Sequence, residues 1–254
     1  MHNILSCNLG SYGSFQDKAL AHLASIGVKH VETRAPAPAE AAALKAKLAA
    51  EGLTATTVMA PCPVERADLA DLFDPVFEGA NVLGAKVVFV SAKAGETPLE
   101  AVYERLRAVG DKAVAAGVKV ALETHPDLCD NGAKMVSTMA AIGHPGIGVN
   151  FDTANVYYYN EGVDAVTELT QALDVIVSVH LKDTGGGYKS WDFPTLGLGV
   201  VDFPSLFAKL NARGFYGPFT MELEGIQGEQ LDEAGKLGRV ADSVAYLRGA
   251  GLVP

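Results

Sequence analysis

The sequence predicts an α/β fold, specifically a (β/α)8 barrel, and three observations lead to this prediction. Short β-branched or apolar segments alternate eight times with amphipathic segments rich in Ala and Leu. The length of 254 residues is typical of one such barrel. The last four apolar segments each end in an acidic residue or a histidine, and barrel active sites lie at the carboxyl ends of the strands. A doubly wound open sheet shares this alternation and stays an alternative.

Eight segments are expected to form the strands. Each is a short run of β-branched or apolar residues that leads into a polar turn. In chain order they are Ile4–Asn8, His30–Arg34, Thr54–Met59, Lys86–Ser91, Val118–Glu123, Ile147–Asp152, Val175–His180 and Phe219–Glu222. Eight strands separated by helices predict a closed barrel with the carboxyl ends of all strands at one mouth.

The segments between the strands are expected to be helices, because they are longer and amphipathic. They include Phe15–Ser25, Ala39–Ala50, Val64–Leu83, Leu99–Ala116, Gly132–Ala141, Val163–Ala172, Phe203–Ala212 and Gly228–Arg248. Gly27, Gly52, Gly84, Gly117 and Gly214 follow helices, where a left-handed residue can turn the chain into the next strand. No low-complexity segment or long Pro/Gly linker divides the chain, so we expect a single barrel domain over residues 1–254.

Composition and charge argue against several classes of protein. The hydrophobic content of 49% can bury a large core, and no apolar run approaches the ~18 residues of a membrane span. The chain starts without a basic signal region, so we expect a soluble, cytoplasmic protein. Cys7, Cys62 and Cys129 are far apart and lack CxxC spacing, which indicates neither a disulfide framework nor a thiolate zinc site. The net charge of −10 argues against nucleic acid as a partner.

Four strand ends carry residues that can bind a metal ion. Glu123, Asp152, His180 and Glu222 lie at or near the ends of the fifth to eighth expected strands. A buried carboxylate is costly unless a cation or hydrogen bonds compensate it, so these residues predict one divalent metal site. Such oxygen-rich ligands with one imidazole suit Mn²⁺ best, and Mg²⁺, Co²⁺ or Zn²⁺ are compatible with the same set. The alternative is that they are unrelated polar strand ends paired with Lys or Arg.

The same strand ends carry motifs of a known family. They are Leu122-Glu123-Thr124-His125-Pro126, Asn150-Phe151-Asp152-Thr153-Ala154-Asn155, Val179-His180-Leu181-Lys182-Asp183 and Met221-Glu222-Leu223-Glu224, together with Val31-Glu32-Thr33-Arg34 and Leu196–Phe203. The chain resembles the xylose isomerase-like TIM barrel family over nearly its whole length. The resemblance implies that Glu123, Asp152, His180 and Glu222 bind one divalent ion and that the two glutamates act as acid and base.

A keto sugar or related polyol at such a site would react beside its carbonyl group. An ion that binds the carbonyl and the neighbouring hydroxyl acidifies the adjacent C–H and stabilises the enediolate that forms when the proton leaves. Return of the proton to the other face epimerises the sugar, and return to the neighbouring carbon interconverts aldose and ketose. Loss of a leaving group instead gives a lyase or dehydratase. The four expected ligands do not decide among these outcomes.

His125 and Asn155 are candidates for contact with the substrate. His125 lies two residues after Glu123, so it faces the same mouth, where an imidazole can act as acid or base or can orient Glu123. It resembles the histidine of family members that eliminate from 3-keto-glycosides. Asn155 occupies a position where several epimerases of the family carry a substrate-binding histidine, and this departure weakens the resemblance to ketohexose 3-epimerases.

Four further residues are expected near the substrate. Lys182 follows the histidine ligand by two residues and either binds a substrate oxygen or pairs with Asp183. Glu32 and Arg34 share the inward parity at the end of the second strand, where they are expected to form a buried pair that either is purely structural or also contacts the substrate. Trp191 lies in the long loop after the seventh strand, from which an aromatic ring can stack on a sugar face or pack on the barrel rim.

These observations favour a metal-dependent sugar isomerase or epimerase. The alternative is a carbon–oxygen lyase of the inosose dehydratase or 3-keto-glycoside eliminase type, with His125 as acid or base. A type IV apurinic endonuclease shares the barrel but needs further histidines, where this chain has Arg34, Met59 and Asn155. A non-catalytic sugar-binding barrel stays open as well. The expected partner is therefore a small sugar or polyol, and a homo-oligomer is compatible with the sequence.

Overall fold

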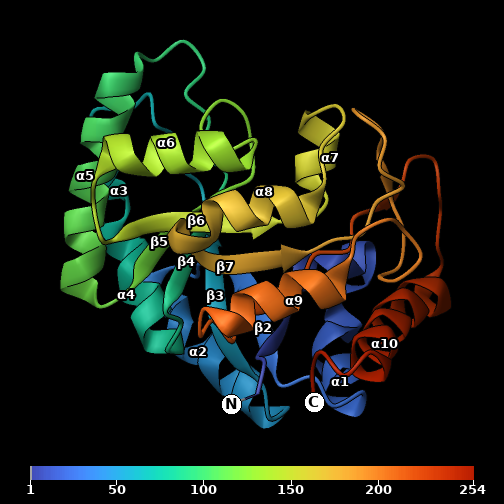
Figure 1. Cartoon of the computed structure of the whole chain (residues 1–254). Coiled ribbons are helices and arrows are strands. Elements are labelled where there is room, and N and C mark those ends of the chain that lie inside the picture. Colours follow the sequence, from blue (N-terminus) through green and yellow to red (C-terminus); the bar gives the residue numbers. More distant parts are fainter. Residues whose placement is uncertain (1) are drawn as a thin grey trace.

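The computed structural model describes residues 2–254 and contains a closed barrel of eight parallel strands with helices around it (Figure 1). The barrel strands are β1 (Leu5–Asn8), β2 (His30–Arg34), β3 (Thr54–Ala60), β4 (Val87–Val90), β5 (Lys119–Glu123), β6 (Ile147–Asp152), β7 (Ile176–Leu181) and β9 (Phe219–Met221). They follow one another in chain order, and β9 closes the barrel by pairing with β1, where Cys7 lies beside Met221. The predicted barrel is confirmed, and the open sheet is wrong.

Helices cover the outside of the strands. They are α1 (Gln16–Ser25), α2 (Pro38–Ala50), α3 (Leu69–Leu72), α4 (Asp74–Leu83), α5 (Leu99–Ala116), α6 (Gly132–Ile142), α7 (Asn155–Tyr159), α8 (Ala165–Ala172), α9 (Phe203–Ala212) and α10 (Glu233–Gly249), with 3-10 turns η1 (Leu9–Phe15) and η2 (Leu173–Val175). The core lies between the two layers, where for example Phe207 of α9 stacks on Phe219 of β9 with ring centroids 4.2 Å apart. None of the helices within residues 2–254 has both the length and the apolar character needed to cross a membrane.

Two helix predictions differ from the structure. The expected helix Val64–Leu83 is instead α3 and α4, because Pro75 lacks an N–H group and is tolerated only in a first helical turn, which makes α4 a new helix. The expected helix Gly228–Arg248 begins only at Glu233, where the carboxylate of Asp232 caps α10 by accepting a hydrogen bond from the Gly235 N–H.

The turns opposite the mouth agree with the sequence prediction. The five expected glycines have φ values of 75°, 70°, 85°, 69° and 84° in chain order. Gly84 and Gly117 end α4 and α5 in the left-handed conformation, so each helix stops where the chain must return to the next strand. A short antiparallel ribbon of β8 (Asp192–Phe193) and β10 (Gly225–Ile226) lies outside the barrel and was not expected from the sequence.

Each barrel strand directs a side chain toward the mouth at or near its carboxyl end. The eight residues are Asn8, Glu32, Met59, Phe89, Glu123, Asp152, His180 and Glu222. They contact one another or line the same cleft, because inward-facing residues of a closed barrel converge on its axis. Met59 and Phe89, from the neighbouring strands β3 and β4, are apolar, and the other six side chains are polar or charged. The groups that can take part in a reaction therefore lie on the side of the mouth away from β3 and β4.

Gly110 in α5 provides a test of helix packing. A methyl group at this buried position would overlap the ring of His144, so Gly110→Ala is expected to lower the free energy of unfolding by about 1–3 kcal/mol despite the better helix propensity of Ala. Gly238 in α10 is the matched control, because within the described residues its added methyl group would lie within 4 Å of nothing beyond its chain neighbours and the local helix backbone. Gly238→Ala is expected to stabilise the protein by about 0.5–1 kcal/mol. Urea unfolding measures both, and equal effects would contradict this packing.

Candidate functional site

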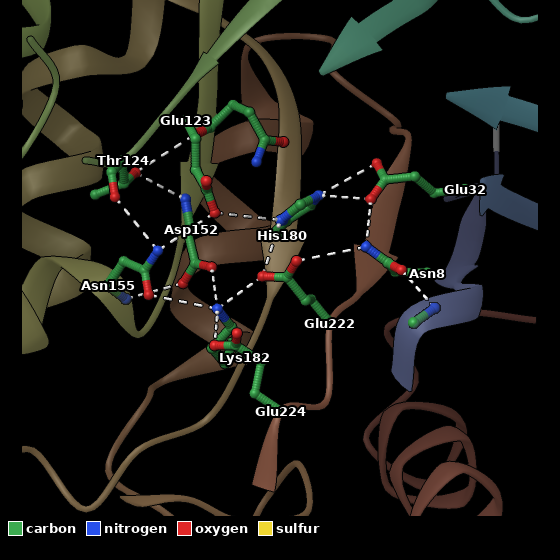
Figure 2. A network of polar contacts seen from close by, with 12 residues as sticks. Asn8, Glu32, Glu123, Thr124, Asp152, Asn155, His180, Lys182, Glu222 and Glu224 are labelled. Carbon is green, nitrogen blue, oxygen red and sulfur yellow. Dashed lines mark hydrogen bonds and ion pairs between the residues drawn. The ribbon is translucent and has the colours of Figure 1, made fainter. Parts of the chain in front are cut away.

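The four expected metal ligands lie together at the mouth of the barrel. Glu123 and Asp152 end β5 and β6, His180 is the penultimate residue of β7, and Glu222 directly follows β9. One donor atom from each lies within 4.8 Å of the donor atoms of the other three. Figure 2 shows these side chains pointing toward a common centre. The group therefore has the donors and the spacing for one divalent ion, and ion binding itself stays a prediction.

The environment of His180 fits a cation at this centre. The ring is fully buried, with Nε2 3.1 Å from Oε1 of Glu32 and Nδ1 3.3 Å from Oε2 of Glu222. Burial lowers the pKa of His180, but the charges of Glu32 and Glu222 outweigh burial and raise this pKa well above its usual range. Nδ1 has no well-oriented hydrogen-bond partner. A proton or a metal ion must therefore separate Nδ1 from the carboxylates, and Glu32 orients the ring as carboxylates do behind metal-bound histidines.

The two glutamates are in different electrostatic environments. Burial and the charge of Glu222 raise the pKa of Glu123 well above its usual range. Burial would also raise the pKa of Glu222, but the charges of Lys182 and His180 outweigh burial and hold this pKa well below its usual range. Without an ion, Glu123 therefore keeps its proton to a higher pH than Glu222 does. Carboxyl groups whose pKa values diverge in this way are typical of acid–base pairs.

Lys182 lies among the carboxylates of the site. Its Nζ atom is 2.9 Å from Oδ2 of Asp152, 2.7 Å from Oε2 of Glu222 and 2.8 Å from Oε2 of Glu224 (Figure 2). The alternative pairing with Asp183 is wrong, because the carboxylate of Asp183 accepts backbone N–H groups of the loop that follows β7. The ammonium group thus offsets the negative charge of the cluster, and its contact with a substrate stays a prediction.

His125 and Asn155 both lie against Glu123. Nε2 of His125 is 3.2 Å from Oε2 of Glu123, and its Nδ1 is 2.9 Å from Oγ of Ser91. Burial, with a smaller effect of the positive charge on Lys93, lowers the pKa of His125 to about 4, so the ring is neutral near pH 7. The amide of Asn155 is 3.4 Å from Oε1 of Glu123, to which it donates a hydrogen bond. Both residues therefore orient Glu123 and also face the cleft.

Glu32 and Arg34 do not form the expected buried pair. Glu32 is buried, lies beside His180 and accepts a hydrogen bond of 2.8 Å from the amide of Asn8. Arg34 is exposed, and within the described residues its guanidinium makes neither an ion pair nor a hydrogen bond. The two residues share a face of β2, but Arg34 is two residues closer to solvent. The buried His180 therefore pairs with Glu32, and Arg34 is left at the rim.

Trp191 lies at the rim of a cleft of about 330 Å³ above the candidate metal ligands. Its carbonyl accepts a hydrogen bond of 2.8 Å from Gln227 beside the β8–β10 ribbon. Its ring packs edge-on against Phe193 and Tyr158, with centroids 5.2 and 6.0 Å away. The ribbon thus fixes the tryptophan beside the cleft, and stacking on a sugar stays a prediction.

Asn8, Glu224 and Lys93 are among the residues of the site that sequence reasoning missed. Asn8 ends β1, and its amide donates to Glu32 at 2.8 Å and to Glu222 at 3.4 Å. Glu224 lies two residues after Glu222, so strand parity could have identified it. Lys93 lines the cleft from the loop after β4, where no periodic pattern applies. Asn8 shows that an uncharged polar residue at a strand end can also indicate a residue of the site.

The fold and the site define this protein as a closed α/β barrel with a carboxylate–histidine group at its carboxyl mouth. The sequence profile of the family described as xylose isomerase-like TIM barrel matches residues 20–248. The chain therefore belongs to the xylose isomerase-like TIM barrel family, as the strand-end motifs predicted.

Relatives within this family include sugar epimerases. The chain is 33% identical over 147 residues to L-ribulose-5-phosphate 3-epimerase UlaE from Salmonella paratyphi C (strain RKS4594), covering 56% of this chain and 49% of that protein. It is 27% identical over 119 residues to a ketose 3-epimerase from Arthrobacter globiformis, covering 45% and 38%. The matches thus span about half the length of these relatives or less. A structure of L-ribulose 3-epimerase superposes with a TM-score of 0.76 at 21% identity over 99% of this chain and 95% of that one, which supports the fold alone.

Glu32→Gln is expected to weaken Mn²⁺ binding by about 10- to 100-fold, because the carboxylate behind a ligating histidine holds the ring and raises its basicity. Calorimetric titration of the metal-free protein with Mn²⁺ measures the affinity. Glu224→Gln is the matched control, since Glu224 contacts Lys182 rather than a candidate ligand. If the two variants bind Mn²⁺ equally well, the orienting role of Glu32 is wrong.

Proposed function

We propose that this protein is a divalent-metal-dependent enzyme that epimerises or isomerises a keto sugar or related polyol. The observation that carries the proposal is the convergence of Glu123, Asp152, His180 and Glu222 at the floor of a cleft of sugar size. The names of the two relatives, an L-ribulose-5-phosphate 3-epimerase and a ketose 3-epimerase, support the same class of reaction. The donor set favours Mn²⁺ over metals that prefer thiolate.

The proposed proton transfer is carried by two glutamates on different sides of the site. An ion held by the four residues would polarise the carbonyl and the adjacent hydroxyl of the sugar. Glu123 and Glu222 extend from β5 and β9, which are separated by β6 and β7, so they can reach opposite faces of a substrate. Glu222, kept ionised by Lys182, is suited to take the proton beside the carbonyl. Glu123, on the other side of the substrate, is suited to return a proton.

The remaining polar groups would bind and orient the sugar. Lys182 and Asn155 lie side by side, with Nζ of Lys182 3.4 Å from Oδ1 of Asn155, and both line the cleft, where each can donate a hydrogen bond to a hydroxyl or carbonyl oxygen. Trp191 at the rim offers an aromatic face, and sugar rings commonly pack on such faces. These contacts would hold the reacting carbons between Glu123 and Glu222, where a proton can be removed and returned without release of the intermediate.

A carbon–oxygen lyase is the second candidate, and the position of His125 favours it. His125 lines the cleft, contacts Glu123 and is neutral near pH 7. A group in this position can assist the departure of a leaving group after the proton beside the carbonyl has been removed. The two reactions share this proton removal and differ only in the fate of the resulting enediolate.

Glu123→Gln and Glu222→Gln are each expected to reduce turnover by about 10²–10⁴-fold, because each removes a proton-transfer group. Products from ketoses, inososes and 3-keto-glycosides with Mn²⁺ are measured by NMR and mass spectrometry. Glu51→Gln at the exposed end of α2 is the control for a surface charge change. Near-normal turnover in either metal-loaded variant would remove that glutamate from the mechanism.

His125→Ala separates the two candidate reactions. In a lyase, this variant is expected to stop elimination while the glutamates still exchange the substrate C–H proton with solvent deuterium. In an epimerase or isomerase, it is expected to lower the rate modestly and to give the same product. NMR reports deuterium incorporation and product formation together, and elimination at the full rate in His125→Ala would rule out its role in a lyase.

A further inference from the structure

The cleft above the candidate metal ligands adjoins a second cavity. This cavity, the rim lobe, has a volume of about 410 Å³ and is lined by Arg34, Ala35, Met59, Ala60, Pro61, Val76, Phe89 and Ser91. Met59, Phe89 and Ser91 also line the central cleft. Because three residues form walls of both cavities, a ligand seated over the metal site can extend into the rim lobe.

The strand register shows how far the rim lobe lies from the site. Arg34 of β2 pairs with Met59 of β3, and Met59 pairs with Phe89 of β4. The ring of Phe89 lies against His180, with centroids 4.5 Å apart. Neighbouring strands are about 4.8 Å apart, so two strand spacings place Arg34 about 10 Å from Phe89 along the barrel wall. The extended arginine side chain can reach back over part of this span. The distance that remains matches the length of a sugar of five or six carbons.

The rim lobe differs in charge from the cavity that lies toward α10. Arg34 is the one charged residue among the described residues that line the rim lobe, and its guanidinium is exposed and unpaired within residues 2–254. Another cavity, which shares Met59 with the rim lobe and lies toward α10, is lined by Glu222 and Glu224 together with Lys236. An anionic group would be repelled by the carboxylates there and attracted in the rim lobe.

We propose that Arg34 binds an anionic group at the end of the substrate that lies away from the reacting carbons. The inference rests on the proposed function and narrows its substrate class to keto sugars that carry a terminal phosphate monoester or carboxylate. Arginine presents a planar fork of N–H donors that can bind two oxygens of either group at once. Met59, Val76 and Phe89 line the same lobe with apolar side chains, so Arg34 is the charged group there that can bind an anion.

Matched ligands and matched variants test this role. The ligands are one ketose in three forms, namely the free sugar, its terminal phosphate monoester and its terminal carboxylic acid. The variants are Arg34→Met, which keeps the apolar stem, Arg34→Lys, which keeps the charge, and Lys47→Met. Lys47 is exposed on α2 and controls for the change in net charge. Calorimetry on the Mn²⁺-loaded protein measures binding, and NMR measures kcat/KM.

Arg34→Met is expected to lose about 10- to 100-fold in affinity and in kcat/KM for one of the anionic forms, the size of effect that a lost hydrogen bond to a charged group has. The free ketose is expected to bind unchanged. Arg34→Lys is expected to recover part of the loss, and Lys47→Met to behave as wild type. Whichever anionic form responds identifies the group as phosphate or carboxylate. Equal affinity of the wild type for all three forms would overturn the proposal, as would an anion preference that survives in Arg34→Met.

Binding and turnover separate this inference from the proposed function. If the anionic ketose binds through Arg34 but exchanges no proton with solvent deuterium, the proposed reaction is wrong and the anion site stands. If all three ketoses react with equal kcat/KM in the wild type and in Arg34→Met, the reaction stands and the anion site is wrong.

Discussion

The structure of the mouth depends on one electrostatic constraint, which is that closely spaced buried carboxylates need positive charge between them. Glu123, Asp152 and Glu222 converge from separate strands, and in the described chain Lys182 and His180 are the cations within 4 Å of more than one of them. A buried carboxylate without such compensation would cost several kcal/mol. The arrangement that compensates the charge of these carboxylates also gives Glu123 and Glu222 pKa values shifted in opposite directions.

A further buried carboxylate organises the rim of the cleft. Asp183 lies two residues after the end of β7, and it accepts hydrogen bonds from backbone N–H groups at both ends of the next loop, including those of Gly197 and Gly199. A side chain at Gly199 would overlap the Asp183 carboxylate, so this close approach requires glycine. The loop is thereby folded back on the barrel, which keeps its aromatic residues beside the cleft.

The distribution of charged side chains along the cleft would decide the orientation of a charged ligand. Glutamates line the centre and the side toward α10 together with lysines, whereas Arg34 is the one charged residue among the described residues that line the rim lobe. A neutral sugar would experience little of this difference, but a ligand with one charged end would enter in a single direction. Such a polarity would bring the carbons remote from the charge to the glutamates, so binding energy at the rim could position the reacting end.

The sequence by itself determined the eight strands, the closed barrel and the four residues that meet at its mouth. These features depend on local properties, since strand parity and position at a strand end decide which side chains reach the axis of a barrel. The choice of partners needed the tertiary structure. Glu32 pairs with His180 rather than Arg34, and Lys182 with three carboxylates rather than Asp183. Sequence proximity favoured the wrong partner in both cases, because only the stagger of the strands and the depth of each residue below the rim decide which charges come within reach.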